Sequence, residues 1–361
     1  MPKQILIIGY LGFENFGDEA LLHVLIKDLI KVGFKREHIT AISNAPAKTI
    51  STHQVNSVNR WNLLEIVIDL LACDNVIFIG GLFQDKTSLR SFIYYFLLLY
   101  VAKALRKKIV FYGVGVGPFL RNISLKLFNL GVSNLELLTV RDNTSSNNFF
   151  DRTNVIVSCD PLWSIEPDYI FQNETASIKW DIPIVGVCLR SNKNFKGHRI
   201  SEIADKLSRI ITGMKDWQVL LIPSMPNEDL PVLYELYDLL SAKVGSTERI
   251  TLLENFNRFP ITQQAGILAS CDVMVSMRYH ALLVPLANGK PVFGIICDQK
   301  IKSLLDFAKQ IGVSPKDDID PPWNYFWQDL EKAQDFARTA KEKTGELHKR
   351  NIEILERLYG T

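Results

Sequence analysis

The chain has almost no excess of charge of either sign. Among its 361 residues, 41 Lys and Arg stand against 39 Asp and Glu, for a formal net charge of +2. A chain so balanced has no general electrostatic field that would attract nucleic acid or hold a membrane surface. We therefore expect no nucleic-acid partner, and any anion must bind at a local site.

Cysteine is scarce, and the few that occur form no C-x-x-C pair. They are odd in number, far apart and mostly embedded in apolar runs: Cys73, Cys159, Cys188, Cys271 and Cys297. This spacing argues against a disulfide framework, and the histidines pair with no carboxylate or Cys at zinc-ligand spacing, so we expect no metal. The start of the chain lacks the basic-then-apolar pattern of a signal peptide. Reduced thiols in a cytoplasmic protein are the expectation.

A hydrophobic run long enough to span a bilayer is also missing. The most apolar segment, FIYYFLLLYVA at residues 92–102, is about half the required length. Four basic residues follow it: Lys103, Arg106, Lys107 and Lys108. Two interpretations stay open, a helix buried against a sheet and an aromatic-rich helix that rests on an anionic membrane surface.

The two common nucleotide-binding loops are absent from the glycine-containing stretch GYLGFENFGDEALL, which follows an apolar run near the N-terminus. Gly12 and Gly17 have the spacing of a P-loop, but Asp18 and Glu19 stand where that loop needs Lys and Ser or Thr. The glycines do not fit the dinucleotide fingerprint Gly-x-Gly-x-x-Gly either. Two carboxylates would repel a triphosphate, so neither nucleotide interpretation holds.

The stretch is nevertheless predicted to be a strand-to-helix turn, where α/β folds hold ligands. In one interpretation, Asp18 and Glu19 only complement the positive end of the helix dipole. In the other, the loop backbone at Gly12 and Gly17, with Asn15 and Asp18, hydrogen-bonds a hydroxyl-rich ligand such as a sugar.

Short apolar runs alternate with helical patterns over most of the chain, which predicts parallel α/β sheets. A polar stretch from Ile165 to Pro183 interrupts this rhythm and separates two such series. We predict a Rossmann-like domain at residues 1–170, a second at 183–320, and a helical tail at 321–361.

Residues that follow the predicted strands are expected to face the ligand, because the carboxyl ends of parallel strands line the crevice of such sheets. Glycines follow two strands in the first half, in GGLFQD, which includes Gln84, and in GVGVGP. Arg141 and Arg190 each follow an apolar strand as its first long cation. Either Arg can bind a ligand or only pair with a carboxylate such as Asp142 or Asp160.

The strongest group of candidate residues comes from two strand ends in the second half. Arg278 and His280 open a helix after one strand, and Lys300 follows the next. A lone His is more often structural, but beside two cations an imidazole that titrates near neutral pH suits acid-base work on a polyanion. No nucleophile elbow of the G-x-S-x-G type is present.

Taken together, the motifs resemble those of the polysaccharide pyruvyl transferase family of the bacterial cell-wall type. They occur in the family's order over nearly the whole chain: GYLGFENFGDEALL, IGGLFQD, YGVGVGP, TVRDN, CDPLW, VCLRSN and VSMRYHALLVPLANGKPV. The resemblance implies an α/β fold of two Rossmann-like domains facing a cleft, similar to GT-B glycosyltransferases, with C-terminal helices packing back. It implies transfer of a carboxyethylidene group from phosphoenolpyruvate to two sugar hydroxyls, giving a cyclic ketal.

The resemblance also implies that Arg141, His280 and Lys300 contact phosphoenolpyruvate, a co-substrate that needs no further cofactor. Its several negative charges call for such cations. We expect His280 to protonate the methylene carbon, with Arg278 and Arg190 as helpers, and Asp18 to orient or deprotonate the acceptor. Gly12, Asn15, Gly17 and Gln84 complete the predicted acceptor side.

The acceptor implied by the resemblance is a sugar on a lipid diphosphate at the cytoplasmic face of the membrane, which peripheral docking through the basic segment would allow. Two other functions stay open: a GT-B glycosyltransferase that uses a nucleotide sugar, and a sugar-binding protein without catalysis. The sequence leaves the acceptor sugar and the oligomeric state undefined.

Overall fold

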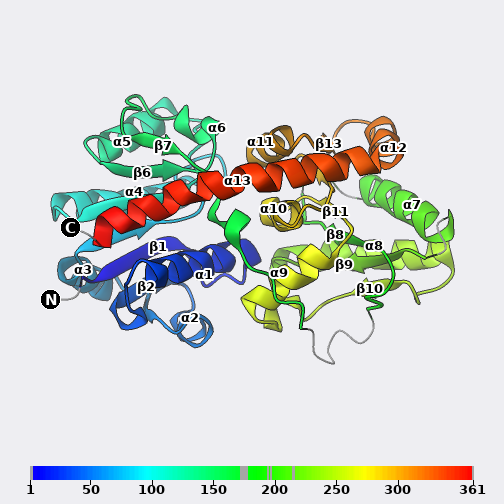
Figure 1. Ribbon diagram of the computed structural model, residues 1–361, viewed down its shortest axis with the longest axis horizontal. Helices are drawn as coiled ribbons and strands as arrows, with labels where there is room; N and C mark the ends of the chain where they lie inside the picture. Colours follow the sequence, from blue (N-terminus) through cyan, green and yellow to red (C-terminus); the bar gives the residue numbers. More distant parts are fainter. Residues whose placement is uncertain (1–2, 171–177, 193–194, 196, 214–215, 360–361) are drawn as a thin grey trace. The chain divides into compact units, whose positions relative to one another are not determined.

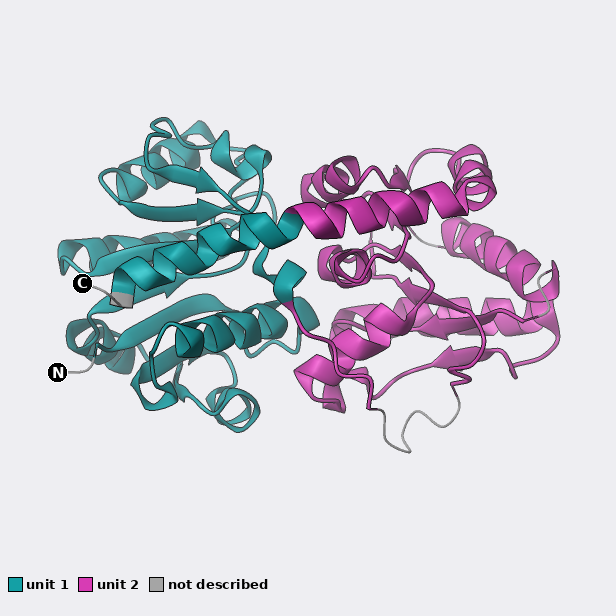
Figure 2. Ribbon diagram, in the orientation of Figure 1, with its two compact units in different colours: residues 1–164, 344–361 teal, residues 165–343 magenta. Residues whose placement is uncertain are grey.

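The structure, a computed structural model, describes residues 3–170, 178–192, 195, 197–213 and 216–359. It divides into two compact units, residues 1–164 with 344–361 (unit 1) and residues 165–343 (unit 2), which Figure 2 colours separately. The predicted connection from Ile165 to Pro183 lies partly outside the described residues, at 171–177.

Unit 1 contains a seven-stranded sheet in the order β3-β2-β1-β4-β5-β6-β7, and all of its strand pairs are parallel. The strands are β1 (Ile5–Leu11), β2 (Ile39–Ser43), β3 (Asn56–Asn59), β4 (Asn75–Phe78), β5 (Lys108–Val114), β6 (Leu137–Val140) and β7 (Val155–Val157). The apolar runs predicted all of these except β3, which is too polar to be recognised because Val58 is its sole apolar side chain.

The helices of unit 1 cover both faces of this sheet. The chain runs outward from β1 to β3 and then returns to β4, so right-handed crossovers place the helices of the two halves on opposite faces. The first face holds α1 (Phe16–Lys31) and α2 (Pro46–His53), and the second holds α3 (Leu63–Ala72), α4 (Leu89–Ala104) and α5 (Asn122–Val132). Between the sheet and α3–α5 lies an apolar core that includes Leu70, Phe92, Leu99 and Phe128.

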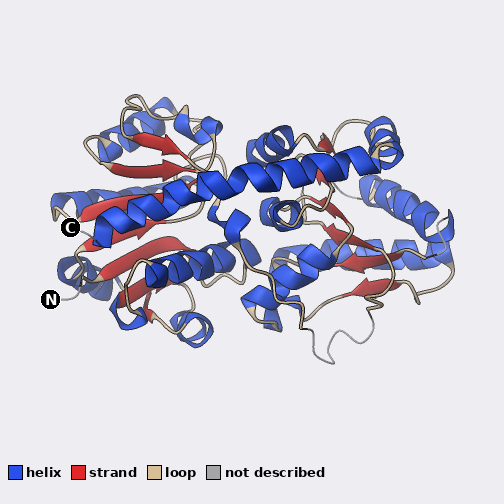
Figure 3. Ribbon diagram, viewed as in Figure 1, coloured by secondary structure: helices blue, strands red, loops and turns tan. Residues whose placement is uncertain are grey.

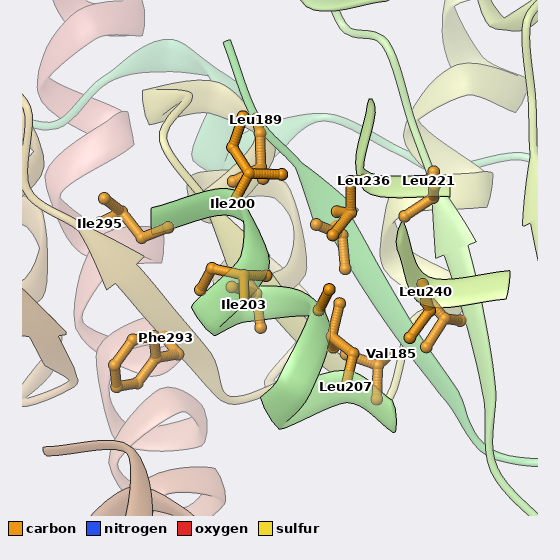
Figure 4. Close-up of a cluster of buried hydrophobic side chains, with 14 of the residues drawn as sticks. Val185, Leu189, Ile200, Ile203, Leu207, Leu221, Leu236, Leu240, Phe293 and Ile295 are labelled. Atoms are coloured by element: carbon orange, nitrogen blue, oxygen red, sulfur yellow. The ribbon is translucent and has the colours of Figure 1, made fainter. Parts of the chain in front are cut away.

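Unit 2 repeats the arrangement with a six-stranded parallel sheet in the order β10-β9-β8-β11-β12-β13. Its strands are β8 (Ile184–Cys188), β9 (Gln218–Leu221), β10 (Ile250–Leu252), β11 (Val273–Ser276), β12 (Val292–Ile295) and β13 (Ile311–Val313). Its helices are α7 (His198–Gly213), α8 (Pro226–Val244), α9 (Ile261–Ser270), α10 (Tyr279–Ala287), α11 (Gln299–Ala308) and α12 (Asp320–Gln328). Strands and helices alternate along the chain (Figure 3), and Val185, Leu207, Leu236 and Phe293 meet in the core (Figure 4).

The chain ends in one long helix, α13 (Leu330–Tyr359), which is the red helix of Figure 1. Its residues up to 343 belong to unit 2 and the later ones to unit 1, so the helix packs back on both units. The reason is that one helix buries apolar side chains in both units, Ala333 and Ala337 in the first part and Ile354, Leu355 and Leu358 in the second.

The end of α13 is fixed on the α1 face of unit 1 by buried polar contacts. The carboxylate of Asp28 in α1 lies 3.0 Å from Nε2 of His348 and accepts a hydrogen bond from the Tyr112 hydroxyl of β5. Ser158 donates to the side chain of Asn351 at 2.7 Å. The predicted α/β class with two Rossmann-like domains and a C-terminal helix that packs back is therefore confirmed.

Within the described residues, no helix combines the length and the apolar character that crossing a bilayer requires.

Candidate functional site

In unit 2, the predicted site residues lie at the carboxyl ends of three adjacent strands. Arg190 follows β8, Arg278 and His280 follow β11, and Lys300 follows β12. The sheet order places β8, β11 and β12 side by side. The strand-end argument from the sequence therefore located these four residues correctly along one edge.

Asp298 links two of these cations. One oxygen of its carboxylate lies 3.7 Å from Nη2 of Arg190 and 4.0 Å from Nζ of Lys300. Its other oxygen caps α11, because it accepts a hydrogen bond from the backbone N–H of Ile301 at 3.1 Å. Arg190 also has a buried Nε that makes no hydrogen bond within the described part of the chain. Two cations thus contact one carboxylate at this edge.

His280 is the second residue of α10 and is partly exposed. Its ring stands edge-on to Tyr279, with ring centroids 5.0 Å apart. The Nζ of Lys300 lies 5.9 Å from the centroid of the same Tyr279 ring. An imidazole and an ammonium therefore each lie near the same aromatic ring, and the predicted joint role of His280 and Lys300 stays a prediction.

Arg278 differs from these residues because carboxylates surround its guanidinium. Asp229 in α8 accepts from both Nε, at 3.0 Å, and Nη2, and Glu228 accepts from Nη2 at 2.8 Å. Burial raises the pKa of Asp229, although the charge and hydrogen bonds of Arg278 oppose that rise. The predicted role of Arg278 in ligand binding stays a prediction, and its clear structural role is to join α10 to α8.

Two thiols lie near this edge, and both are protonated at neutral pH. Burial raises the pKa of Cys297 to about 11, which neighbouring Arg190 opposes, and raises that of Cys188 to about 12. A thiolate is the nucleophilic form of cysteine, so neither residue suits nucleophilic catalysis.

In unit 1, the glycine-containing loop after β1 is fixed by Glu19. The Glu19 carboxylate accepts from the backbone N–H of Gly12 at 2.7 Å and contacts Nε2 of buried His53 at 3.1 Å. Gly12 has a φ of +79°, and a Cβ there would collide with Ser43 and with the backbone of Ala45. Glu19 and Gly12 therefore shape the loop, which leaves Asp18 as the carboxylate with a candidate ligand role.

Asp18 lies in the first turn of α1 and is oriented by its neighbours. Asn15, the N-cap of α1, donates to Asp18 at 2.6 Å and accepts from the backbone N–H of Gly17 at 3.2 Å. The backbone of Gly80, after the adjacent strand β4, passes so close that a Cβ would stand 3.4 Å from the other oxygen of Asp18. The loop thus brings together Gly12, Asn15, Gly17 and Asp18 as predicted, while the Gln84 amide contacts its own loop at Gly81 and Thr87.

Arg141 follows β6 and is held between the two carboxylates that the sequence named. Its Nε lies 3.3 Å from Asp142, and its Nη1 lies 3.6 Å from Asp160. A Cβ at Gly115 would lie 2.6 Å from Nη2 of Arg141, so this glycine leaves room for the arginine itself. The space beside Gly115 is therefore taken by the Arg141 side chain, and ligand binding by Arg141 stays a prediction.

The sequence reasoning missed Arg60, which is 6% exposed and follows β3. Its guanidinium carbon lies 4.6 to 5.7 Å from the ring centroids of Phe13, Trp61, Tyr94 and Tyr95. Its buried Nε has no hydrogen-bond partner among the described residues. Phe13 belongs to the loop after β1, so Arg60 supports that loop through cation–π contacts. Recognition of β3 as a strand would have placed Arg60 at the same edge as Asp18.

Comparisons with solved structures agree with the two-unit fold. S. aureus MnaA, solved with UDP, matches with a TM-score of 0.66 and 14% identity over 93% of this chain and 90% of that chain. A UDP-GlcNAc 2-epimerase from Neisseria meningitidis, bound to UDP-GlcNAc, matches with a TM-score of 0.64 and 14% identity over 98% and 99%. Anabaena HepE in complex with UDP-glucose matches with a TM-score of 0.60 and 14% identity over 99% and 100%. At this level of identity the likeness shows the fold alone.

No curated protein matches the chain in sequence. A family model, described as polysaccharide pyruvyl transferase, matches residues 15–299, which include Asp18, Arg141, Arg190, His280 and Asp298, while Gly12 and Lys300 lie just outside it. Because that match covers well over half of the chain, the protein belongs to the polysaccharide pyruvyl transferase family.

Proposed function

We propose that this protein transfers a pyruvyl group from phosphoenolpyruvate to two hydroxyls of a sugar in a cell-surface polysaccharide precursor. The observation that carries the proposal is the edge of unit 2, where Arg190 and Lys300 share Asp298 and His280 stands against the same Tyr279 ring as Lys300. Phosphoenolpyruvate carries a carboxylate and a phosphate, and a planar guanidinium and a point-like ammonium are the groups that bind such anions.

In the proposed reaction, protonated His280 donates its proton to the methylene carbon of phosphoenolpyruvate, which becomes the methyl group. The cation that develops at C2 is captured by one sugar hydroxyl. The C2–O bond to phosphate then breaks, its electron pair leaves with inorganic phosphate, and a second hydroxyl closes the ketal. The two hydroxyl protons leave in these steps, and one of them restores His280. Arg190, Lys300 and Arg141 hold the anion, with Arg278 in a supporting role.

We assign the acceptor to the edge of unit 1. Sugar hydroxyls need acceptors and amides, and Asp18 with Asn15 offers both beside the backbone of Gly80. Asp18 would orient one hydroxyl and accept its proton as the new C–O bond forms. Gly12, Gly17 and Gln84 would contribute backbone and amide groups around it. We also propose that the acceptor sugar is carried on a lipid diphosphate.

Thermal unfolding with phosphoenolpyruvate tests the donor. A ligand at 100 times its dissociation constant adds about 2.7 kcal/mol to the free energy of unfolding, so the melting temperature should rise clearly. UDP serves as the comparison ligand, because the solved neighbours bind uridine nucleotides. A rise with UDP and none with phosphoenolpyruvate would overturn the proposal in favour of a nucleotide-sugar glycosyltransferase.

Two variants test Arg141 from different directions. Arg141→Gln removes the guanidinium, and Gly115→Ala leaves it in place but pushes a Cβ against it. If Arg141 holds phosphoenolpyruvate, both should weaken the stabilisation by that ligand. Arg121→Gln is a control, because Arg121 is an exposed arginine of unit 1 whose partner is the buried Asp85.

A further inference from the structure

An exposed apolar surface covers one face of unit 1. Among the described residues, 21 large hydrophobic side chains are exposed, and 13 of them lie on or next to α3, α4 and α5. They are Trp61, Leu63, Leu64, Val67, Ile68 and Leu71 at α3, Leu89, Ile93, Leu97 and Val101 on α4, and Leu120, Ile123 and Leu130 at α5. Scattered single side chains of this kind are normal on a protein surface, but a gathering of this size marks an interaction site. We call these residues the apolar face.

Helix α3 shows how unusual this surface is. Ile66 and Leu70 point into the core, while Leu64, Ile68 and Leu71 are 72%, 54% and 59% exposed. A helix that is apolar on nearly every side is normally buried on every side. Five apolar side chains of α3 therefore face water: Leu63, Leu64, Val67, Ile68 and Leu71.

Hydrogen bonds between neighbouring helices make the apolar face continuous. Near the start of α3, the Tyr94 hydroxyl of α4 donates to the backbone of Arg60 at 3.0 Å. At its end, Lys107 donates to the carbonyls of Leu71 and Cys73 at 2.9 and 2.7 Å. Lys103 of α4 donates to the carbonyl of Leu130 at the end of α5 at 3.0 Å. The three helices therefore lie side by side.

The charges around the apolar face are mostly positive. Between residues 61 and 132, the exposed charged side chains are five cations, Lys86, Arg90, Arg106, Arg121 and Lys126, and two carboxylates, Glu65 and Asp74. The whole chain, in contrast, is almost neutral. Of the four basic residues noted after residue 102 in the sequence, only Arg106 is among these exposed cations. Lys103 and Lys107 are less exposed and donate hydrogen bonds to carbonyls near helix ends.

We propose that the apolar face docks on the surface of an anionic lipid bilayer, with the apolar side chains in the interfacial region and the cations against lipid headgroups. Exposed apolar side chains that include a Trp, together with flanking basic residues, are the combination that holds a protein in the interface plane. A second copy of the chain is a poorer partner, because a two-fold dimer would bring the same excess of positive charge together from both sides. Docking does not depend on the proposed reaction.

Vesicle flotation tests the proposal with the full chain. Vesicles of phosphatidylcholine alone are compared with vesicles of phosphatidylcholine and phosphatidylglycerol in equal parts. The triple variant Leu64→Gln, Ile68→Gln, Leu97→Gln changes exposed side chains and should fold normally. A matched control, Phe307→Gln with Tyr325→Gln, changes side chains of unit 2 that are 43% and 50% exposed.

We expect the wild type and the control to float with the anionic vesicles, and the triple variant to partition to them at least about tenfold less, because burial of apolar area drives interfacial binding. Arg90→Gln with Lys126→Gln should lower binding to anionic vesicles and leave the weak binding to neutral ones unchanged. Equal flotation of the triple variant and the wild type would overturn the proposal. So would a dimeric wild type that does not float and becomes monomeric in the triple variant.

The same samples separate this proposal from the proposed function. No residue changed here belongs to the candidate site, so stabilisation by phosphoenolpyruvate should be the same in all of these variants. Failure of phosphoenolpyruvate to bind the wild type would count against the reaction and leave the flotation result standing.

Discussion

The strand edges of the two units carry opposite chemistry on similar backbones. In unit 1, the residues after the strands include Asp18 and Arg141, and Arg141 is bracketed by Asp142 and Asp160. In unit 2, Arg190 and Lys300 share a single carboxylate, and His280 lies beside them. At the first edge one cation lies between two carboxylates. At the second, Arg278 is already paired with Asp229 and Glu228, and Arg190 and Lys300 both contact Asp298.

This difference indicates which of the two proposed substrates, the sugar acceptor or the anionic donor, each unit suits. A carboxylate accepts hydrogen bonds from hydroxyls and an amide can also donate to them, whereas a carboxylate repels an anion. Paired cations with limited neutralisation attract a carboxylate and a phosphate. Both units expose the carboxyl ends of parallel strands, and the side chains at those ends alone set the sign of the charge there.

The largest expected effect comes from His280, because only this residue is assigned a proton transfer at the basic edge. His280→Gln keeps a hydrogen-bonding side chain of similar size but cannot act as an acid. We expect the rate of phosphate release in the presence of acceptor to fall about 10²- to 10⁴-fold, while stabilisation by phosphoenolpyruvate persists. His198→Gln, at a histidine whose side chain is 84% exposed, is the control. A variant that retains full turnover would remove His280 from the mechanism.

A smaller effect is expected from the positive charge at the same edge. Lys300→Gln should weaken phosphoenolpyruvate binding by about 10- to 100-fold, since hydrogen bonds to charged groups contribute about 1.5–3 kcal/mol. Lys302→Gln is a matched control, because Lys302 lies on the same helix, is half exposed and pairs with Asp306 at 2.8 Å. Titration calorimetry measures both. Equal losses in the two variants would mean that the general charge of α11, and not a site, attracts the donor.

The neighbouring carboxylates Asp18 and Glu19 allow the acidic edge to be tested in the same way. Asp18→Asn should lower kcat about 10²- to 10⁴-fold, because the amide cannot accept the hydroxyl proton, and should raise the KM for the sugar acceptor up to about tenfold. Glu19→Gln should instead lower the free energy of unfolding by about 1–2 kcal/mol, because Glu19 bonds Gly12 and His53. Acceptor kinetics and denaturant unfolding of both variants separate the two roles. The assignment fails if Glu19→Gln alters acceptor KM and Asp18→Asn does not.

The sequence predicted the edge of unit 2 better than that of unit 1, for a physical reason. Strands β8 and β12 are apolar throughout and β11 is apolar up to Ser276, so the first cations after β8 and β11, Arg190 and Arg278, stand out. In unit 1, β3 reads Asn-Ser-Val-Asn, and its periodicity is too weak to indicate a strand. Arg60 after it was therefore not considered, although it packs on the same loop as Asp18.

The sequence could not show which of the other residues are already paired, because their partners are distant along the chain. The pairing of Arg278 with Asp229 joins residues that are 49 positions apart, and no local pattern connects them. Gly115 stands in a run of glycines that resembles a ligand-binding loop, yet the guanidinium of Arg141 fills the space that a Cβ at this position would need. Patterns in the sequence identify which residues reach an edge, but only packing tells which of them are already paired.

The smallest expected effect concerns how acid acts on the two units, because their buried carboxylates are shifted in opposite directions. In unit 1, burial would raise the pKa of Asp28, but hydrogen bonds from His348 and Tyr112 outweigh it and lower that pKa below 3.8. Burial would also raise the pKa of Asp85, but hydrogen bonds that include those from the backbone N–H groups of Leu120 and Arg121 outweigh it and lower that pKa. In unit 2, burial dominates and raises the pKa of Asp229.

The sign of the pH dependence follows from these directions. A carboxyl group with a lowered folded-state pKa stabilises the fold above its unfolded pKa, and that contribution is lost as the pH falls through the folded value. The contribution of Asp229, whose folded-state pKa is raised, is present below the unfolded pKa and is lost as the pH rises. Below about pH 4, unit 1 should therefore open before unit 2. Hydrogen exchange of β5 and β8 amides at pH 5 and pH 3, corrected for intrinsic rates, measures this, and Asp28→Asn should reduce the sensitivity of β5. Earlier opening of β8 would show that the buried carboxylates do not control the acid response of either unit.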